Sequence, residues 1–180
     1  MSRVQSFAPI ENAKARVLIL GSMPGRASLA AGQYYAHAHN LFWRILGEIT
    51  GAAPSLPYAT RAGALKSSGI ALWDVLATCK REGSLDSAID DATVRANDFA
   101  AFYRAHPRIE HVFFNGAKAE ACYRRHVLPL LADAAASRSY RRLPSTSPAN
   151  ASMSRAHKQE VWRQALRLAL AHRHPRAGAA

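Results

Sequence analysis

Aromatic and polar side chains are concentrated in residues 17–43, directly after a short apolar run. Residues 17–20 read Val-Leu-Ile-Leu, and the loop that follows, called the first loop below, consists of Gly21, Ser22, Met23, Pro24 and Gly25. Tyrosine, histidine, asparagine and phenylalanine then come in quick succession, at Tyr34, Tyr35, His37, His39, Asn40, Phe42 and Trp43. Such side chains can stack on a flat ring and hydrogen-bond to its edge. The same pattern also fits a structural turn followed by an aromatic helix start, so the rest of the chain has to decide.

The order of apolar and amphipathic segments predicts an α/β fold. Short apolar runs predict strands at residues 16–20, 70–73, 109–114 and 140–143. Helical spacing predicts helices at residues 40–50, 59–67, 97–106, 117–134 (with a bend at Pro129) and 156–172. Residues 79–91 are polar, and we expect them to be irregular. Helical crossovers make the strands parallel, so the prediction is a three-layer α/β/α sandwich with a short four-stranded parallel sheet.

The length of 180 residues favours a single domain. We expect its core to cover about residues 16–172, followed by a frayed basic tail at 173–180. In the last predicted helix, the spacing of Val161, Ala165 and Leu168 indicates a buried face, with Arg163 and Arg167 pointing outward.

The four predicted strands should end at the same edge of the sheet, where open α/β folds bind their ligands. That arrangement brings four features together: the first loop, Asp74, Asn115 and a Ser/Pro-rich loop. The last of these, called the second loop, consists of Ser145, Thr146, Ser147, Pro148, Ala149 and Asn150. The convergence of all four is a stronger indication of a binding site than any one of them.

The composition excludes several classes of protein. No apolar run approaches the roughly 20 residues that span a membrane, and residues 1–12 lack the layout of a signal peptide. The two cysteines, Cys79 and Cys122, form no C-x-x-C pair, and the neighbouring histidines His37 and His39 have no accompanying carboxylate pattern. We therefore expect a cytoplasmic protein without a metal, a cofactor or a membrane partner.

Positive charge is large and unevenly distributed along the chain. Residues 1–100 hold ten Lys and Arg against eight Asp and Glu, whereas residues 101–180 hold fourteen against four, which together give the net charge of +12. Such asymmetry favours a polyanionic partner, and nucleic acid is the commonest. A compositional bias toward Ala and Arg is the alternative explanation.

Three motifs occur in order along the chain. The first comprises the first loop together with Ser28, Leu29, Tyr34, Tyr35, Ala36, His37, Asn40, Phe42 and Trp43. The middle one is Ala71-Leu72-Trp73-Asp74-Val75, with Gly83-Ser84-Leu85-Asp86-Ser87 beyond it, and the second loop supplies the last. Together they resemble the uracil-DNA glycosylase superfamily, and most of all its hypoxanthine-DNA (deoxyinosine) glycosylase branch, family 6. The resemblance covers roughly residues 16 to 170, with the motifs in the expected order and spacing.

The resemblance implies a role for each motif. Phe42 would stack on an extruded base, Asp74 would accept from a ring N–H such as N1–H of hypoxanthine, and Asn40 would orient the attacking water. Many family members carry the water-positioning residue right after the first Gly of the first loop, where this chain has Ser22. The first loop and Tyr35 would line the base pocket together with Asn115. Core packing for Phe42, a turn for Asp74 and a helix cap for Asn40 remain the structural alternatives.

The second loop would contact the phosphates that flank the lesion, helped by Arg141, Arg142 and Arg155. No lysine lies in a motif, so a Schiff-base lyase step is not indicated. The implied activity is a monofunctional glycosylase, expected as a monomer, whose partner is DNA containing deaminated bases. The alternatives are a catalytically weak DNA-lesion-binding relative and a small nucleotide-binding α/β protein.

Overall fold

A four-stranded parallel sheet lies at the centre of the fold. The structure is a computed structural model that describes residues 2–131 and 137–171. The strand order is β3-β2-β6-β7, with bounds β2 Val17–Gly21, β3 Ile70–Asp74, β6 His111–Asn115 and β7 Ser139–Leu143. All three pairings are parallel, and Gly21 lies opposite Asp74 in the register of β2 and β3. The predicted α/β fold and its four parallel strands are confirmed, with small shifts at the strand ends.

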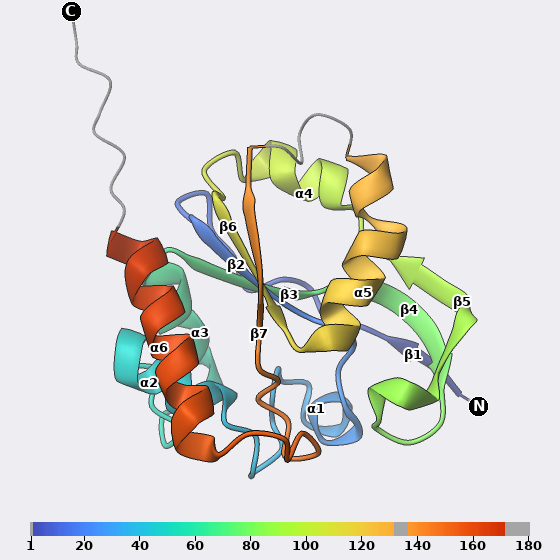
Figure 1. Cartoon of the computed structure of the whole chain (residues 1–180), viewed down its shortest axis with the longest axis horizontal. Coiled ribbons are helices and arrows are strands. Elements are labelled where there is room, and N and C mark those ends of the chain that lie inside the picture. The colour runs from blue at the N-terminus through green and yellow to red at the C-terminus, as the bar shows by residue number, and fades with distance from the viewer. Residues whose placement is uncertain (1, 132–136, 172–180) are drawn as a thin grey trace, which may run out of the picture.

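Helices cover both faces of this sheet (Figure 1). Helices α2 (Phe42–Thr50), α3 (Tyr58–Ser67) and α6 (Arg155–Ala171) pack on one face, while α4 (Phe99–Ala105) and α5 (Ala117–His126) pack on the other. Successive residues of β2 point to opposite faces of the sheet. Ile19 therefore packs in the hydrophobic cluster beneath α2, α3 and α6, and Leu18 packs in the cluster beneath α4 and α5. Burial on both faces explains why β2 is apolar throughout.

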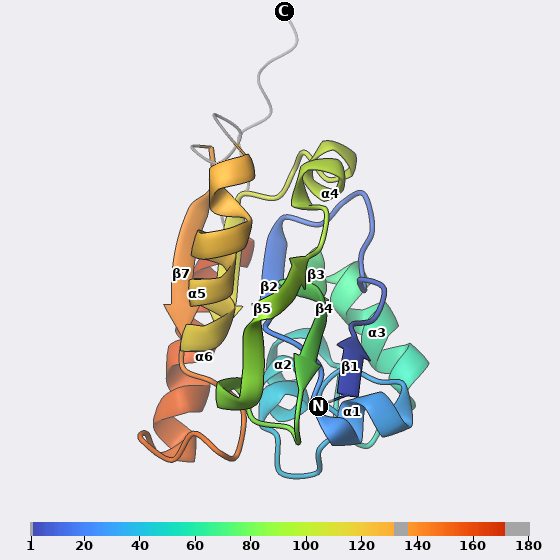
Figure 2. The same ribbon diagram turned by 90° about the vertical axis from the view of Figure 1, so that its right-hand side faces the viewer.

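A second sheet, which the sequence pattern did not predict, lies beside α5 (Figure 2). Its antiparallel order is β1-β4-β5, with bounds β1 Ser2–Gln5, β4 Leu76–Arg81 and β5 Ile89–Ala96. The expectation that residues 79–91 are irregular is therefore wrong, and ordered structure begins well before residue 16. The signal was hidden because β5 is mostly polar, with its middle exposed, and its register with β4 shifts twice. A 3-10 turn, η1 (Asp86–Ala88), lies within the connection between the two strands.

Two helix predictions need correction. Helix α5 ends at His126 and is followed by a 3-10 turn, η2 (Leu128–Leu130), because Pro129 has no N–H to continue the helix. The rest of the predicted helix, at 132–134, and the predicted tail at 173–180 lie outside the described residues. A further short helix, α1 (Arg26–Ala31), follows the first loop and was not predicted.

Helix α6 buries only part of the face that was expected: Ala165 is buried, Val161 packs against the core and Arg167 is exposed, but Leu168 points outward. Trp162, Ala165, Leu166 and Ala169 are buried, whereas Leu168 is 59% exposed. The indole Nε1 of Trp162 donates to the carbonyl oxygen of Pro144 at 2.8 Å, which fixes the rotation of the helix against the segment leading into the second loop. Apolar residues occur on several faces of this helix, so spacing alone could not select the buried one.

Candidate active site

The ends of the parallel strands bring the predicted site segments to one edge of the sheet. After β2 and β3 end at Gly21 and Asp74, the chain segments stay joined, because the N–H of Val75 donates to the carbonyl oxygen of Gly21 at 2.8 Å. On the other side of β2, Asn115 ends β6 and the second loop follows β7. The expected convergence at this edge is present, but the residues divide between a buried polar centre and an open cavity.

The buried polar centre is built around Gly21 and Asp74. A Cβ atom added to Gly21 would lie 2.4 Å from Asp74 Oδ1 and 3.0 Å from Tyr35 Oη, so only glycine fits at the end of β2. Asp74 is 3% exposed, and its Oδ2 accepts a hydrogen bond of 2.7 Å from Ser6 Oγ. The Asp74 carboxylate and the Tyr35 hydroxyl therefore face the same point beside the first loop.

The Asp74 carboxyl group is poised to change its charge near neutral pH. Burial, which disfavours the charged form, raises its pKa to about 7. The Ser6 hydrogen bond and the positive charge of Arg81 act in the opposite direction, while the negative charge of Asp86 adds to the rise. The group can therefore accept a hydrogen bond above this pH and donate one below it.

Tyr35, and not Phe42, presents an aromatic ring to solvent. The two rings stack with centroids 4.0 Å apart and an interplanar angle of 20°, and Phe42 is completely buried beneath Tyr35. The prediction that Phe42 contacts a base directly therefore needs correction, since its ring supports Tyr35 instead. Tyr35 has φ of 54°, a left-handed conformation that no other non-glycine residue adopts within the described parts of the chain. Its Oη is buried and has no hydrogen-bond partner in those parts.

The pKa of the Tyr35 hydroxyl is raised, mainly by burial and then by the charge of Asp74, whereas the nearby Asn115 opposes the rise. The hydroxyl is therefore neutral at physiological pH. An unpaired buried O–H is unfavourable, so this group is available to a polar ligand atom that enters beside it.

Asn40 lies in an open cavity of about 270 Å³ that it shares with Tyr35. Its Oδ1 accepts a hydrogen bond of 3.0 Å from the backbone N–H of Phe42, the first residue of α2, so Asn40 caps the helix start from the position before the N-cap residue, Leu41. The cavity has basic side chains and no carboxylate in its lining, which consists of Gln33, Tyr35, Ala36, His37, Ala38, His39, Asn40, Leu41, Trp43, Arg44, Pro54, Arg61 and Arg155. Such a lining suits a phosphate-bearing ligand.

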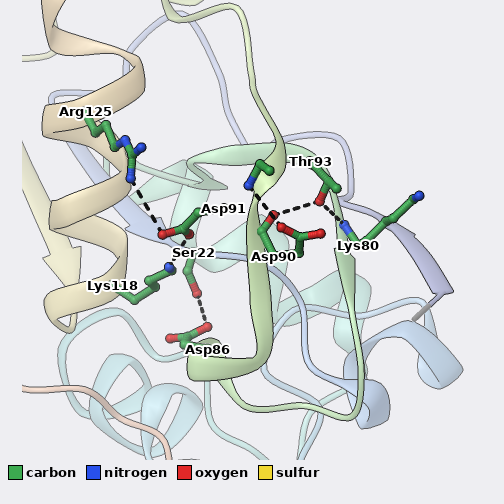
Figure 3. Close-up of polar contacts among 9 residues, drawn as sticks. Ser22, Lys80, Asp86, Asp90, Asp91, Thr93, Lys118 and Arg125 are labelled. Carbon is green, nitrogen blue, oxygen red and sulfur yellow. Dashed lines mark hydrogen bonds and ion pairs between the residues drawn. The ribbon is translucent and has the colours of Figure 1, made fainter.

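The first loop turns most of its side chains away from this cavity. Met23 is 6% exposed and packs in the hydrophobic core, so its predicted contact with a base needs correction. Ser22 is also buried, and its Oγ donates to Asp86 Oδ1 at 2.6 Å (Figure 3). The carbonyl oxygen of Pro24 accepts from Arg81, and Gly25 occupies the N-cap position of α1.

Asn115 connects the end of β6 to the second loop. Its Nδ2 donates to Thr146 Oγ1 and its Oδ1 accepts from the N–H of Thr146, both at 2.9 Å. The carbonyl oxygen of Thr146 in turn accepts from the N–H of Leu41 at 3.1 Å. Thr146 is completely buried, so these contacts hold the second loop against the start of α2 rather than offering Asn115 to a ligand.

The rest of the second loop is stabilised by short-range hydrogen bonds. The N–H groups of Ser147 and Ala149 donate to Ser145 Oγ and Ser147 Oγ, both at 3.3 Å. Pro148 and Ala149 are exposed at its tip, while the carbonyl oxygen of Asn150 accepts from the buried Lys158. The loop is thus a preformed, exposed turn.

The three predicted DNA-contacting arginines are exposed, but they occupy different places. Arg155 begins α6 and lines the cavity beside Asn40. Arg141 and Arg142 lie on β7, at the edge of the sheet, and Arg142 makes an ion pair of 3.4 Å with Glu120. Arg44 and Arg61, which the sequence pattern did not single out, also line the cavity.

Three site residues were missed because they come from elements distant in sequence. Ser6 follows β1, Arg81 ends β4 and Asp86 begins η1. Asp86 belongs to the stretch 83–87 already noted for its resemblance to the middle signature, and this was the only signal. Burial raises the pKa of its carboxyl group, which is turned inward toward Ser22 although the residue as a whole is exposed.

Ion pairs fix the hairpin that carries Arg81 and Asp86. Asp91 on β5 lies between two basic side chains of α5, 2.7 Å from Lys118 Nζ and 3.7 Å from Arg125 Nη1 (Figure 3). Within residues 2–131 and 137–171, no cluster of three or more His, Cys, Asp or Glu side chains could hold a metal ion. No helix in the same residues is long and apolar enough to cross a membrane.

Comparison with known proteins identifies the family of this chain. Residues 8–167 match the family profile of the Uracil DNA glycosylase superfamily. A hypoxanthine DNA glycosylase of Methanosarcina barkeri is 43% identical over 63% of this chain and 72% of the relative, and one of Methanosarcina acetivorans is 36% identical over 64% and 72%. The solution NMR structure of a candidate uracil DNA glycosylase from M. acetivorans superposes with a TM-score of 0.76, at 32% identity over 93% of this chain and 99% of that one. The chain therefore belongs to the uracil DNA glycosylase superfamily.

Proposed function

We propose that this chain is a monofunctional DNA glycosylase that extrudes a deaminated base, hypoxanthine and/or uracil, and hydrolyses its N-glycosidic bond. The observation that carries the proposal is the cavity shared by Tyr35, Asn40 and Arg155, which combines an aromatic ring, a side-chain amide and a cation. The amide is suited to orienting a water and the cation to binding a phosphate. The similarity to two hypoxanthine DNA glycosylases supports hypoxanthine as a substrate.

Base recognition begins with stacking. The glycosidic carbon of a stacked nucleotide is inaccessible, so the nucleotide has to leave the duplex. In the cavity, the ring of Tyr35 offers a stacking surface supported from behind by Phe42. The hydroxyl end of the same ring lies near Asp74, so the edge of a stacked base is directed toward that carboxylate. Because Asp74 is 3% exposed, direct contact with the base requires a small opening of the first loop or of Tyr35.

Hydrolysis needs an oriented water and a stabilised leaving base. An amide oxygen has two acceptor sites, and the cap hydrogen bond to Phe42 uses one of those on Asn40, which leaves the other for the O–H of a water. The water oxygen forms a bond to C1′ of the sugar, and the C1′–N bond breaks with its electron pair passing to the base. One proton of the water stays on the new C1′ hydroxyl and the other passes to the anionic base, so the products are a neutral free base and an abasic site. An oxocarbenium-like sugar needs no strong base for this attack.

The proposal is tested with duplexes that each contain a single deoxyinosine or deoxyuridine. Incubation followed by alkali should cleave the strand at the lesion, and an undamaged duplex of the same sequence is the control. The Asn40→Ala variant serves as a matched protein control that should bind the lesion but cleave it about 10²- to 10³-fold more slowly. Absence of cleavage on both lesions, at a protein concentration that saturates binding, would instead indicate a DNA-lesion-binding relative without catalytic activity.

A further inference from the structure

Arg81 is a buried cation with unused hydrogen-bonding capacity. It is 1% exposed, and its Nη2 donates to the carbonyl oxygen of Pro24 at 2.5 Å. Its Nε and Nη1 atoms are buried without a partner in the described residues. No carboxylate of those residues lies within ion-pair distance of the guanidinium. Burying an unpaired charge is costly, so stability alone does not explain an arginine at this position.

Two carboxylates lie near this cation, and each lies beside a residue of the first loop. Asp74 ends β3 beside Gly21, and Asp86 binds Ser22 from η1. The positive charge of Arg81 favours the ionised form of both carboxyl groups. The other groups that face Asp74 are the Ser6 hydroxyl, which donates to it, and three tyrosines whose pKa values are raised so that all stay neutral: Tyr34, Tyr35 and Tyr58.

The proposed reaction creates an electrostatic conflict that this cation can resolve. An ionised Asp74 accepts from N1–H of hypoxanthine, but the base leaves with the electron pair of the C1′–N bond and becomes negatively charged. Two like charges in a poorly solvated site repel each other, which would slow the step. The positive charge of Arg81, which is held against the first loop by its hydrogen bond to Pro24, can compensate the negative charges of Asp74 and of the departing base.

We propose that Arg81 is a positioning residue of the base pocket, which fixes the first loop through Pro24 and compensates the negative charges of Asp74 and of the departing base. This inference rests on the proposed function and assigns the electrostatic support for base release to β4. It also accounts for the two unpaired N–H groups, because a guanidinium paired with a carboxylate would have less charge to offer the base.

The test separates charge from structure with two substitutions. Arg81→Lys keeps the charge but shortens the reach to Pro24, whereas Arg81→Gln removes the charge, with Arg81→Met as the replacement if Gln does not fold. Arg16→Gln is the matched control. Arg16 precedes β2, so it lies at the amino-terminal ends of the parallel strands, away from the first loop, and it pairs with Glu110. Ser6→Ala gives a benchmark, since it removes the direct hydrogen bond to Asp74.

The first measurement is the pKa of Asp74 by ¹³C NMR of its carboxyl group, assigned with Asp74→Asn, and it does not depend on activity. In Arg81→Gln this pKa should rise by about one unit, in the same direction as in Ser6→Ala, while Arg81→Lys and Arg16→Gln should stay close to wild type. The inference would be overturned if the pKa of Asp74 were unchanged in Arg81→Gln, or if it shifted equally in Arg81→Lys and Arg81→Gln.

The second measurement is the single-turnover rate of deoxyinosine excision as a function of pH. Arg81→Gln should be slower by about one to two orders of magnitude, and the pH at which its rate is half-maximal should be higher by the same amount as the pKa. The excision rate of Arg81→Lys should depend on pH in the same way as that of the wild type. If the wild-type protein were inactive but the pKa of Asp74 shifted as expected in the variants, the proposed function would be refuted but the charge compensation would not. If the wild-type protein were active but the pKa of Asp74 did not shift in Arg81→Gln, only this inference would be refuted.

Discussion

Asn40 has two roles in our interpretation, and substitutions can separate them. Its Oδ1 caps helix α2 through the N–H of Phe42, and the same oxygen is proposed to orient the attacking water. Asn40→Ala removes both functions. Asn40→Ser keeps a side-chain oxygen that can accept from the helix start but withdraws it from the cavity. The pair of variants therefore distinguishes a cap from a catalytic group.

The expected magnitudes differ enough to be resolved. Loss of the cap in Asn40→Ala should lower the free energy of unfolding by about 1 kcal/mol, which is a decrease in Tm of roughly 2–4 °C for a chain of this size. Asn40→Ser should lie within about 0.5 kcal/mol of wild type. Loss of one oriented group should reduce the rate about 10²- to 10³-fold in both variants, or about 2.7–4.1 kcal/mol in the activation free energy.

The assay is single-turnover excision of hypoxanthine at 25 °C with enzyme in excess, combined with thermal unfolding of each variant. A loss of about 1 kcal/mol from a typical stability of about 5–15 kcal/mol leaves the protein almost completely folded, so unfolding cannot imitate the expected rate loss. Affinity for lesion-containing duplex should stay close to wild type. A destabilised Asn40→Ala with a near wild-type rate would show that Asn40 is a cap alone, and a fully active Asn40→Ser would refute the role of the amide.

Three further predictions follow from the site. Because the pKa of Asp74 is about 7 and ionised Asp74 is the form that accepts from N1–H, hypoxanthine excision should increase as the pH rises through this range. Asp74→Asn should abolish that dependence and change the ratio of hypoxanthine to uracil excision; equal losses on both substrates with an unchanged profile would make Asp74 structural. The raised pKa also means that folding favours the protonated form, so Asp74 lowers stability as the pH rises from about 4 to 7, and Asp74→Asn should be less sensitive to pH in thermal unfolding. Gly21→Ala should lower both stability and excision rate, since its Cβ would lie 2.4 Å from Asp74 Oδ1, with Gly63→Ala as a control that meets no atom; a fully active Gly21→Ala would contradict the crowded geometry. Single Ala substitutions of Arg141, Arg142 and Arg155 should weaken binding to damaged and undamaged duplex alike and make the salt slope shallower by about one unit for each lost phosphate contact, whereas parallel salt titrations would exclude these residues from the interface.

The sequence by itself determined the central sheet and the order of its motifs. Residues 17–20 and 70–73 are apolar without interruption because helices cover both sides of the sheet, so their strands could be recognised locally. The parallel arrangement then followed from the crossovers, and with it the common edge at which Gly21 and Asp74 meet. These features depend on short-range pattern and on topology, which a linear sequence contains.

Tertiary structure decided which of these side chains face a ligand. Phe42 and Tyr35 have the same stacking chemistry, but the left-handed backbone at Tyr35 places its ring over Phe42 and buries the latter. Likewise, the buried face of α6 is selected by its contact with Pro144 and not by its own spacing.

The partners of Asp74 were also beyond the reach of sequence pattern. Ser6 follows β1 and Arg81 ends β4, two strands of a second sheet that carries a weak, mostly polar signal, and neither residue lies in a recognisable motif. The pKa of a carboxyl group depends on burial and on charges brought close by folding, and both are properties of distances in space. The sequence could therefore name Asn40 and Asp74 as candidate groups for the chemistry, whereas their exposure and charge state exist only in the folded protein.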